Sequence, residues 1–413
     1  MAFAPRRRAL RLWAYWRAEQ RTLRQGFVAL LLSTLAAFVA GIALGSITHT
    51  LEAFPGLFIL IPAVLSMRGT IFGAMGARLG TSTHAGLFEV TRARTGVLYQ
   101  NVFVAVVLTL LSSLYLALLA RAAATAFGLP SISAVDFMAI AVVGGVIDSA
   151  LILGLTVLLS VICYRRNYDL DAVSTPIITA VADMVTVPTI WLATFVTRVE
   201  AVSTAVAVVA VVASLALAIR GLTTDLKPVR RILLEMLGVV LLTPFLDILA
   251  GTVVEARLER FEEFPALLVI IPPFVAVAGA LGGILSSRLS SKLQLGLLTP
   301  RRLPEAPAVL DGSLVVGFAI VIFTVIGALG LAYAAVTGSG SPGATTMLWS
   351  SFLAGMIATV VALVVAYYVA IGTARFGLDP DNHSVPIITS VLDLAGVVAL
   401  LLVLSLSGVT AHG

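Results

Sequence analysis

The chain has 413 residues, of which 60% are hydrophobic and only 11% are charged, whereas charged residues make up about 25% of a typical soluble domain. This composition excludes an ordinary soluble globular protein. The single cysteine, Cys163, excludes a disulfide framework and a thiolate metal cluster.

Eleven apolar stretches are long enough to cross a membrane as α-helices, for which about 20 residues are needed. A basic segment, residues 1–26, precedes the first of them. The stretches are centred near Phe38, Met67, Leu110, Ala150, Val187, Val211, Leu241, Phe274, Val325, Val360 and Val397. They are continuous apolar runs and lack the alternation of β-barrel strands. The sequence therefore predicts an all-α polytopic membrane protein surrounded by membrane lipid.

The positive charges lie mostly on one side of the predicted helices. Of the 26 Lys and Arg residues, 21 fall in the N-terminal segment and the loops on its side, four fall on the opposite side, and Arg68 lies inside a helix. Because cytoplasmic loops carry the excess of positive charge, we expect a cytoplasmic N-terminus and an outside C-terminus in the cell membrane. The formal net charge of +5 then reflects topology, and we infer no nucleic-acid partner from it.

The chain repeats itself at an offset of 210 residues without a gap. One repeated block begins with Glu52, which recurs as Glu262. In a second block, nine of the fifteen positions in residues 169–183 are identical to those in residues 379–393. Such agreement indicates duplication of one membrane unit, and paired repeats usually place the substrate site at their interface.

Each copy contains five spanning helices, so a direct connection would invert the second copy. The apolar stretch 201–219 belongs to neither copy and returns the chain to its starting side. We therefore predict two parallel five-helix repeats related by a pseudo-two-fold axis along the membrane normal. A monomer could then hold a complete pathway. The predicted divisions are a basic segment at 1–26, the first repeat at 27–198, the connector helix and its loop at 199–230, and the second repeat at 231–413.

Ionisable groups at membrane depth are costly and mark ion or substrate paths by default. Among those in this sequence, only Asp183 and Asp393 are repeat mates, so we expect them to face each other across the axis. Thr179 and Thr389 precede them by one helical turn, on the same face. Carboxylate and hydroxyl oxygens suit a hard divalent cation such as Mg²⁺. The alternative is that each aspartate bonds a neighbouring helix and only fixes packing.

We expect these two helices to begin at Pro176 and Pro386. Four aspartates and one asparagine precede them, in the loops on the cytoplasmic side: Asp169, Asp171, Asp379, Asp381 and Asn382. Such residues are common at turns and helix N-caps. As a duplicated cluster at the mouth of a pathway, they could also concentrate cations.

The second helix of each repeat follows a proline and carries small residues, among them Gly69, Thr70 and Gly279. Small residues at helical spacing let helices pack closely. A helix broken by proline and glycine can instead expose carbonyl oxygens to a cavity. These positions are therefore candidates for the pathway lining.

Two segments, IPAVLSMRGTIFGAMGARLGTSTHAG and LDPDNHSVPIITSVLDLAG, with the looser copy LDAVSTPIITAVAD, resemble the MgtE magnesium channel family, and more closely its two-repeat solute-carrier relatives. The resemblance covers nearly the whole chain. It implies that Mg²⁺, as the transported ion, passes between the repeats and is bound by Asp183 and Asp393. The family's Gly-Asn pair is replaced by Gly69-Thr70 and Gly279-Ala280. The family's N-terminal and CBS regulatory domains are not expected here.

Our first interpretation is a divalent-cation channel or transporter that prefers Mg²⁺. Exchange of a divalent cation against Na⁺ or H⁺ stays open, with Asp148 and Asp247 as coupling candidates, although each could equally serve packing. A membrane enzyme is a further alternative, but the sequence has no His-Glu-x-x-His pair and its four histidines do not cluster. A scaffold without transport would leave the paired aspartates unexplained.

Overall fold

The computed structural model describes residues 15–17, 19–91, 93–166, 170–258, 263–376 and 380–408, apart from the side chains at 21–22, 84, 166, 170–176 and 380–383. Helices and their connections make up all of this described part. Eleven of the helices are long and apolar enough to cross a membrane. The predicted all-α class and the predicted number of spans are therefore confirmed.

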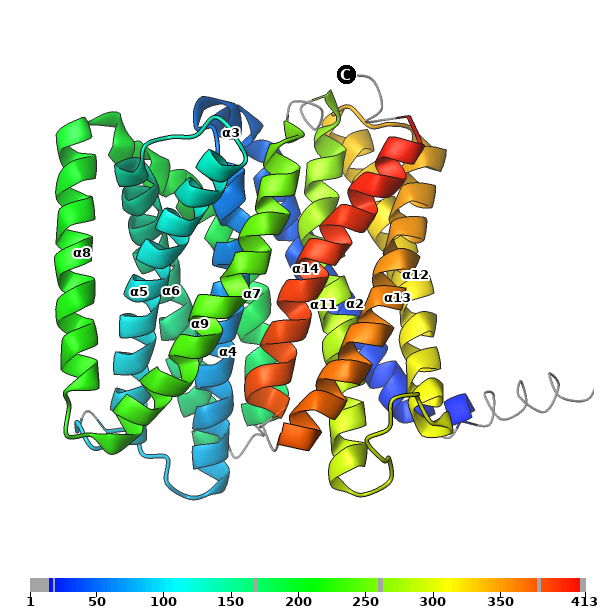
Figure 1. Cartoon of the computed structure of the whole chain (residues 1–413), viewed down its shortest axis with the longest axis horizontal. Helices are drawn as coiled ribbons and strands as arrows, with labels where there is room; N and C mark the ends of the chain where they lie inside the picture. Colours follow the sequence, from blue (N-terminus) through cyan, green and yellow to red (C-terminus); the bar gives the residue numbers. More distant parts are fainter. Residues whose placement is uncertain are drawn as a thin grey trace, which may run out of the picture. The chain divides into compact units, whose positions relative to one another are not determined.

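Figure 1 shows the helices with their labels. One of them, α8, contains the predicted connector at 201–219 and is itself long enough to cross a membrane. Their bounds are α2 Gln20–Ser46, α3 Thr48–Ala53, α4 Leu57–His84, α5 Val97–Ala126, α6 Ala134–Arg166, α7 Leu170–Thr194, the 3₁₀ helix η1 Phe195–Arg198, α8 Glu200–Leu222, α9 Lys227–Glu255, α11 Pro265–Gln294, α12 Ala306–Thr337, α13 Ala344–Phe376 and α14 Pro380–Leu406.

The duplication seen in the sequence extends to local backbone structure. Helices α6 and α13 both have 33 residues and bounds that differ by the repeat offset. After α4 and α11 the chain turns through Gly86 and Gly296, each with φ of 69°. Leu87 then donates to the Ser82 carbonyl and Leu297 to the Lys292 carbonyl, both at 2.9 Å. A hydrogen bond that spans six residues in this way is typical of a helix that ends at a glycine. It occurs in both repeats.

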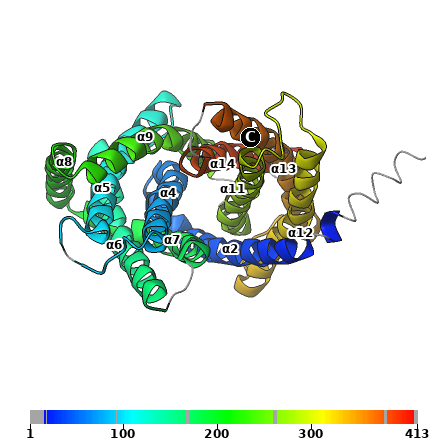
Figure 2. The same ribbon diagram turned by 90° about the horizontal axis from the view of Figure 1, so that it is seen from below.

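The helices pack as two compact units, Val39–Glu262 and Met1–Phe38 with Glu263–Gly413. In the first unit, α4 to α7 pack together, α8 covers α5 and α6, and α9 lies against α4 and α5 (Figure 2). In the second unit, α11 to α14 pack together, and Phe27 of α2 contacts Phe318 of α12. The opening helix of the second repeat, α9, thus packs within the unit that holds the first repeat. Packing units and sequence repeats are different divisions of the chain, and the repeat boundaries stay a prediction.

Helix α9 is joined to the other helices of the first unit by three hydrogen bonds and one close backbone approach. The Glu255 carboxylate accepts hydrogen bonds from the backbone N–H groups of Gly56, at 2.6 Å, and Phe58, at 3.1 Å. The Tyr115 hydroxyl of α5 donates to the Leu241 carbonyl of α9 at 2.7 Å. A Cβ added to Gly251 would lie 2.5 Å from the Ile59 carbonyl oxygen, so only glycine permits this approach.

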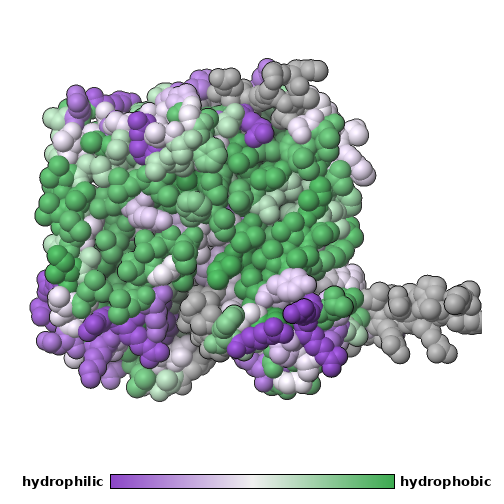
Figure 3. All heavy atoms as spheres, in the orientation of Figure 1, coloured by the Kyte–Doolittle hydropathy of each residue, from purple (hydrophilic) through white to green (hydrophobic). Residues whose placement is uncertain are grey.

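The outer helix faces carry large apolar side chains, as expected for contact with lipid. Leu242 of α9 is 76% exposed and Val209 of α8 is 66% exposed. Figure 3 shows hydrophobic side chains over the middle of the helices and hydrophilic ones gathered near the helix ends.

Candidate functional site

Asp183 and Asp393 occupy the same place in α7 and α14, near the middle of helices of 25 and 27 residues. Each is therefore about 20 Å of helix rise from the first residue of its helix. Asp183 is half-buried and Asp393 is buried, with 8% of its surface exposed. Asp183 belongs to one compact unit and Asp393 to the other, and their pairing across an axis stays a prediction.

Both helices begin several residues before the prolines at which the sequence analysis placed their start. Because α7 starts at Leu170 and α14 at Pro380, Asp171, Asp381 and Asn382 lie in the first helical turns and not in loops. Acidic residues and an opening proline are favourable there, since the first turn has unpaired N–H groups and a positive dipole end. The side chains of these three residues, and Asp169 and Asp379 entirely, lie outside the described residues.

The threonines that precede the aspartates are half-buried, as expected for side chains that border a pathway. The Thr389 hydroxyl donates to the carbonyls of Val385, at 3.1 Å, and Pro386, at 3.0 Å. Its hydrogen is used within its own helix, so its oxygen lone pairs stay available to accept a hydrogen bond or bind a cation. Thr179 occupies the matching position on α7.

The second and fifth helices of each repeat pack against each other, α4 against α7 and α11 against α14. In the second unit, a Cβ added to Gly279 would lie 3.3 Å from Thr389 Cγ2, so these two predicted site residues lie side by side. One turn on, a Cβ at Gly282 would meet Leu392 at 2.5 Å. The glycines of α11 therefore set how closely α14 approaches.

The first unit has open space at the corresponding place. A Cβ added to Gly69, the repeat mate of Gly279, would meet no described heavy atom within 4 Å. Gly69 and Thr70 are both half-buried, and residues at helical spacing on either side, Ser66 and Gly73, are half-buried too. One face of α4 thus carries a half-buried stripe of small and polar residues, which fits a pathway lining.

Asp148 does not stand alone in the membrane-spanning region, because it is paired with Arg68. The Arg68 Nε lies 3.0 Å from Asp148 Oδ2, and the two side chains are 1% and 0% exposed. The sequence identified both residues but gave no sign of their pairing. Asp247, the second coupling candidate, is fully buried on α9.

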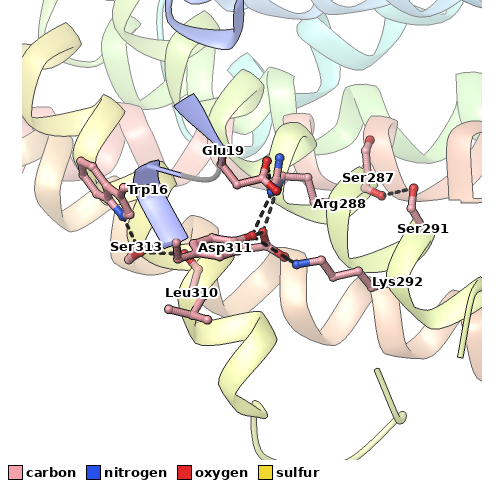
Figure 4. A network of polar contacts seen from close by, with 10 residues as sticks. Trp16, Glu19, Ser287, Arg288, Ser291, Lys292, Leu310, Asp311 and Ser313 are labelled. Atoms are coloured by element: carbon pink, nitrogen blue, oxygen red, sulfur yellow. Dashed lines mark hydrogen bonds and ion pairs between the residues drawn. The ribbon is translucent and has the colours of Figure 1, made fainter. Parts of the chain in front are cut away.

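A second ion network, which the sequence analysis missed, lies in the other unit, where Asp311 of α12 is fully buried (Figure 4). Its carboxylate pairs with Arg288, at 2.8 Å, and Lys292, at 2.6 Å, and accepts a hydrogen bond from Tyr15 at 2.6 Å. Glu19 adds a carboxylate 3.2 Å from Arg288. Burial raises the pKa of the Tyr15 hydroxyl, and its bond to Asp311 adds to this rise.

The first unit contains a version of this network in which an amide replaces the carboxylate. Arg78, the repeat mate of Arg288, donates from Nε to Asn101 Oδ1 at 2.8 Å, and Asn101 is the repeat mate of Asp311. A sequence signal for both networks was available, because each repeat has an arginine followed 23 residues later by an Asn or Asp. Among the described residues, no three His, Cys, Asp or Glu side chains form a group that could hold a metal.

A known protein family matches this chain in both of its repeats. The model of the MgtE family, described as a divalent cation transporter, matches residues 61–193 and 271–403. The chain belongs to the MgtE family of divalent cation transporters. The two matched regions contain all four helices of the candidate pathway, α4, α7, α11 and α14, apart from their ends.

Two mammalian proteins are similar over most of their length. The chain is 25% identical to solute carrier family 41 member 3 of Rattus norvegicus, over 91% of this chain and 85% of that protein. It is also 25% identical to solute carrier family 41 member 3 of Mus musculus, over 90% of this chain and 80% of that protein. No solved structure matches the chain.

Proposed function

We propose that this MgtE-family transporter carries Mg²⁺ across the cell membrane, with the ion passing between the two repeats and bound near the midplane by Asp183 and Asp393. One observation carries the proposal. Two carboxylates occupy the same mid-helix position in duplicated helices, each one turn after a half-buried threonine. A carboxylate at such depth is costly unless it serves an ion or substrate path.

The chemistry of this set suits a partly hydrated ion. Mg²⁺ usually keeps several of its waters and is held by one or two carboxylates, whereas Ca²⁺ takes more oxygen ligands from the protein. One carboxylate from each repeat, with the Thr179 and Thr389 hydroxyls as partners for bound water, meets the smaller demand. A cation between the carboxylates would also offset their mutual repulsion.

Coupled exchange against Na⁺ or H⁺ is the second candidate function, and the burial of Asp247 favours it. This carboxylate is fully buried in α9, within a candidate membrane span. Asp148 is a weaker coupling candidate than the sequence indicated, because its carboxylate already has Arg68 as a counter-ion. Ion flux measured with and without Na⁺ and proton gradients separates exchange from a channel.

We further infer a cytoplasmic N-terminus, an outside C-terminus and a monomer sufficient for transport. The asymmetric distribution of Lys and Arg supports the orientation. The presence of both repeats in one chain supports the monomer. Labelling of cysteines introduced at each end of the chain would test the orientation.

The test of the site is ion uptake by the purified protein in liposomes, with Mg²⁺, Mn²⁺, Co²⁺ and Ca²⁺ compared. We expect Asp183→Asn or Asp393→Asn to lower Mg²⁺ flux roughly tenfold or more, because each removes one of the two charges that offset dehydration of the ion. The double variant should abolish flux. Asp225→Asn, at an exposed loop aspartate, is the matched control and should transport normally.

Flux must be normalised to folded protein, because a packing role predicts a different result. If the aspartates only joined helices, their variants would lose stability while each folded molecule still transported. Near-normal flux per folded molecule in the double Asn variant would refute the proposed site.

A further inference from the structure

The Arg68–Asp148 pair joins four helices of the first unit. Besides the ion pair, Arg68 Nη2 donates to Ser113 Oγ of α5 at 3.2 Å. On α6, the Ser149 hydroxyl donates to Asp148 Oδ1 at 3.1 Å. From α7, the Thr186 hydroxyl donates to the Ala182 carbonyl at 2.8 Å and also lies 3.4 Å from Asp148 Oδ2. Because Arg68 is on α4 and Asp148 on α6, the network ties α7 to both.

The second repeat fills the same place with apolar side chains. The repeat mates of Arg68, Ser113 and Asp148 are the buried residues Ala278, Phe323 and Ala358. Phe323 packs on Phe274, with ring centroids 4.8 Å apart.

A repeated glycine makes room for each filling. A Cβ added to Gly145 would clash with the Arg68 guanidinium, and one added to Gly355 would clash with the Phe323 ring. One fold position thus accepts either an ion pair or an aromatic ring.

Stability alone does not account for the ion pair. Replacing a buried ion pair by packed apolar side chains is often neutral or stabilising, and the second repeat contains such an apolar core. The pair is also incompletely bonded, since Arg68 Nη1 has no hydrogen-bond partner in the described part of the chain. A role in the electrostatics of the neighbouring helix accounts for both observations.

Helix α7 connects the pair to the proposed cation site. Thr186 follows Asp183 by three residues, so the two side chains lie on the same face of α7, one turn apart. Asp148 reaches this face through Thr186. A net charge at Arg68 or Asp148 would therefore act on a cation held by Asp183.

We propose that Arg68 and Asp148 form a positioning and specificity-determining pair for the first-repeat half of the cation site. This inference rests on the proposed role of Asp183. Arg68 neutralises Asp148, so that the pair adds no net charge beside Asp183. The contacts of the pair with α5 and α7 hold the Asp183 carboxylate in register with α4.

The proposal predicts shifts of opposite sign in the KM for Mg²⁺. Asp148→Asn leaves the Arg68 charge uncompensated beside the site, so KM should rise roughly tenfold. Arg68→Met leaves the Asp148 charge uncompensated, so KM should fall by a similar factor. The triple variant Arg68→Ala, Ser113→Phe, Asp148→Ala copies the apolar core of the second repeat and should restore a KM close to wild type.

If the pair only stabilised the packing of the helices, the two single variants would not shift KM in opposite directions. The effect of lost packing does not depend on the sign of the charge that is removed. The control is Asp311→Asn, which breaks an ion network in the other unit and copies the bonded Arg78–Asn101 arrangement. It should leave KM unchanged. Liposome uptake at graded Mg²⁺ concentrations gives KM and the maximal rate per folded molecule.

Two results would overturn the inference, and they can be told apart. If the two single variants fold but keep the wild-type KM, or shift it in the same direction, the pair does not act on the site. If the Asp183→Asn Asp393→Asn variant transports normally in the same assay, the proposed site is wrong and the inference fails with it. Should one single variant fail to fold, the other still decides, since a wild-type KM in that variant would contradict the proposal.

Discussion

The attachment of α9 to α4 gives a prediction of stability that can be worked from the contacts. The Glu255 carboxylate binds the N–H groups of Gly56 and Phe58 at the start of α4. Gly56 itself has no side chain and a φ of 83°, so α4 has no cap of its own. Glu255 therefore serves as an N-cap supplied by another helix, and its charge also meets the positive end of the α4 dipole.

We expect Glu255→Ala to destabilise the protein by about 2 kcal/mol, which combines the loss of a cap with the loss of a favourable charge at a helix N-terminus. For a folded unit of about 200 residues, this corresponds to a fall in Tm of roughly 4–8 °C. The Tm of Glu255→Gln should lie between those of the wild type and Glu255→Ala, because an amide keeps one acceptor oxygen but not the charge.

Thermal unfolding of the purified protein in detergent, followed by loss of monodisperse protein, measures the effect. Glu235→Ala is the matched control, since Glu235 lies on the same helix and makes only an exposed pair with Arg231. Exposed pairs of this kind contribute about 0.2–1 kcal/mol. If Glu255→Ala lowered Tm no more than Glu235→Ala, the capping argument would be wrong.

Two further predictions concern the second unit and use the same unfolding assay. Gly282→Ala should lower stability by about 1–3 kcal/mol, because the added Cβ would overlap Leu392. Gly372→Ala, where a Cβ meets nothing within 4 Å, should be neutral or slightly stabilising, and equal effects would contradict the packing argument. Asp311→Ala should cost about 3–5 kcal/mol, since it leaves Arg288 and Lys292 without their buried counter-ion. A loss below 1 kcal/mol would instead mean that solvent or Glu19 replaces that carboxylate.

The fold was largely predictable because its strongest signals are local or periodic. Apolar length alone located every span, including the connector within α8. The repeat offset predicted which helices correspond, as the matching bounds of α6 and α13 bear out. Helix starts were less predictable, because Pro176 and Pro386 were taken as openings although α7 and α14 begin a turn or more earlier.

The contacts between distant residues could not be predicted from one sequence. Arg68 and Asp148 are separated by 80 residues, and each reads by itself as an isolated charge at membrane depth. The packing of α9 with α4 depends on Gly251 and Glu255. Gly251 recurs at the repeat offset as the mate of Gly41, but Glu255 corresponds to Gly45 and so is not marked by the repeat. Only the three-dimensional structure shows that Arg68 is paired with Asp148 and that Glu255, the last residue of α9, caps α4.

The two repeats differ in charge at one fully buried place. Arg68 and Asp148 in one repeat correspond to alanines in the other, and both arrangements fill the space beside an equivalent glycine. Thr179 and Asp183, in contrast, are identical to their mates although they lie on a half-buried face of an apolar helix. Packing constraints are tighter in the core than on a half-buried face, so packing alone would predict the reverse. The proposed sharing of one ion between the repeats would require that these polar residues stay the same while the cores behind them diverge.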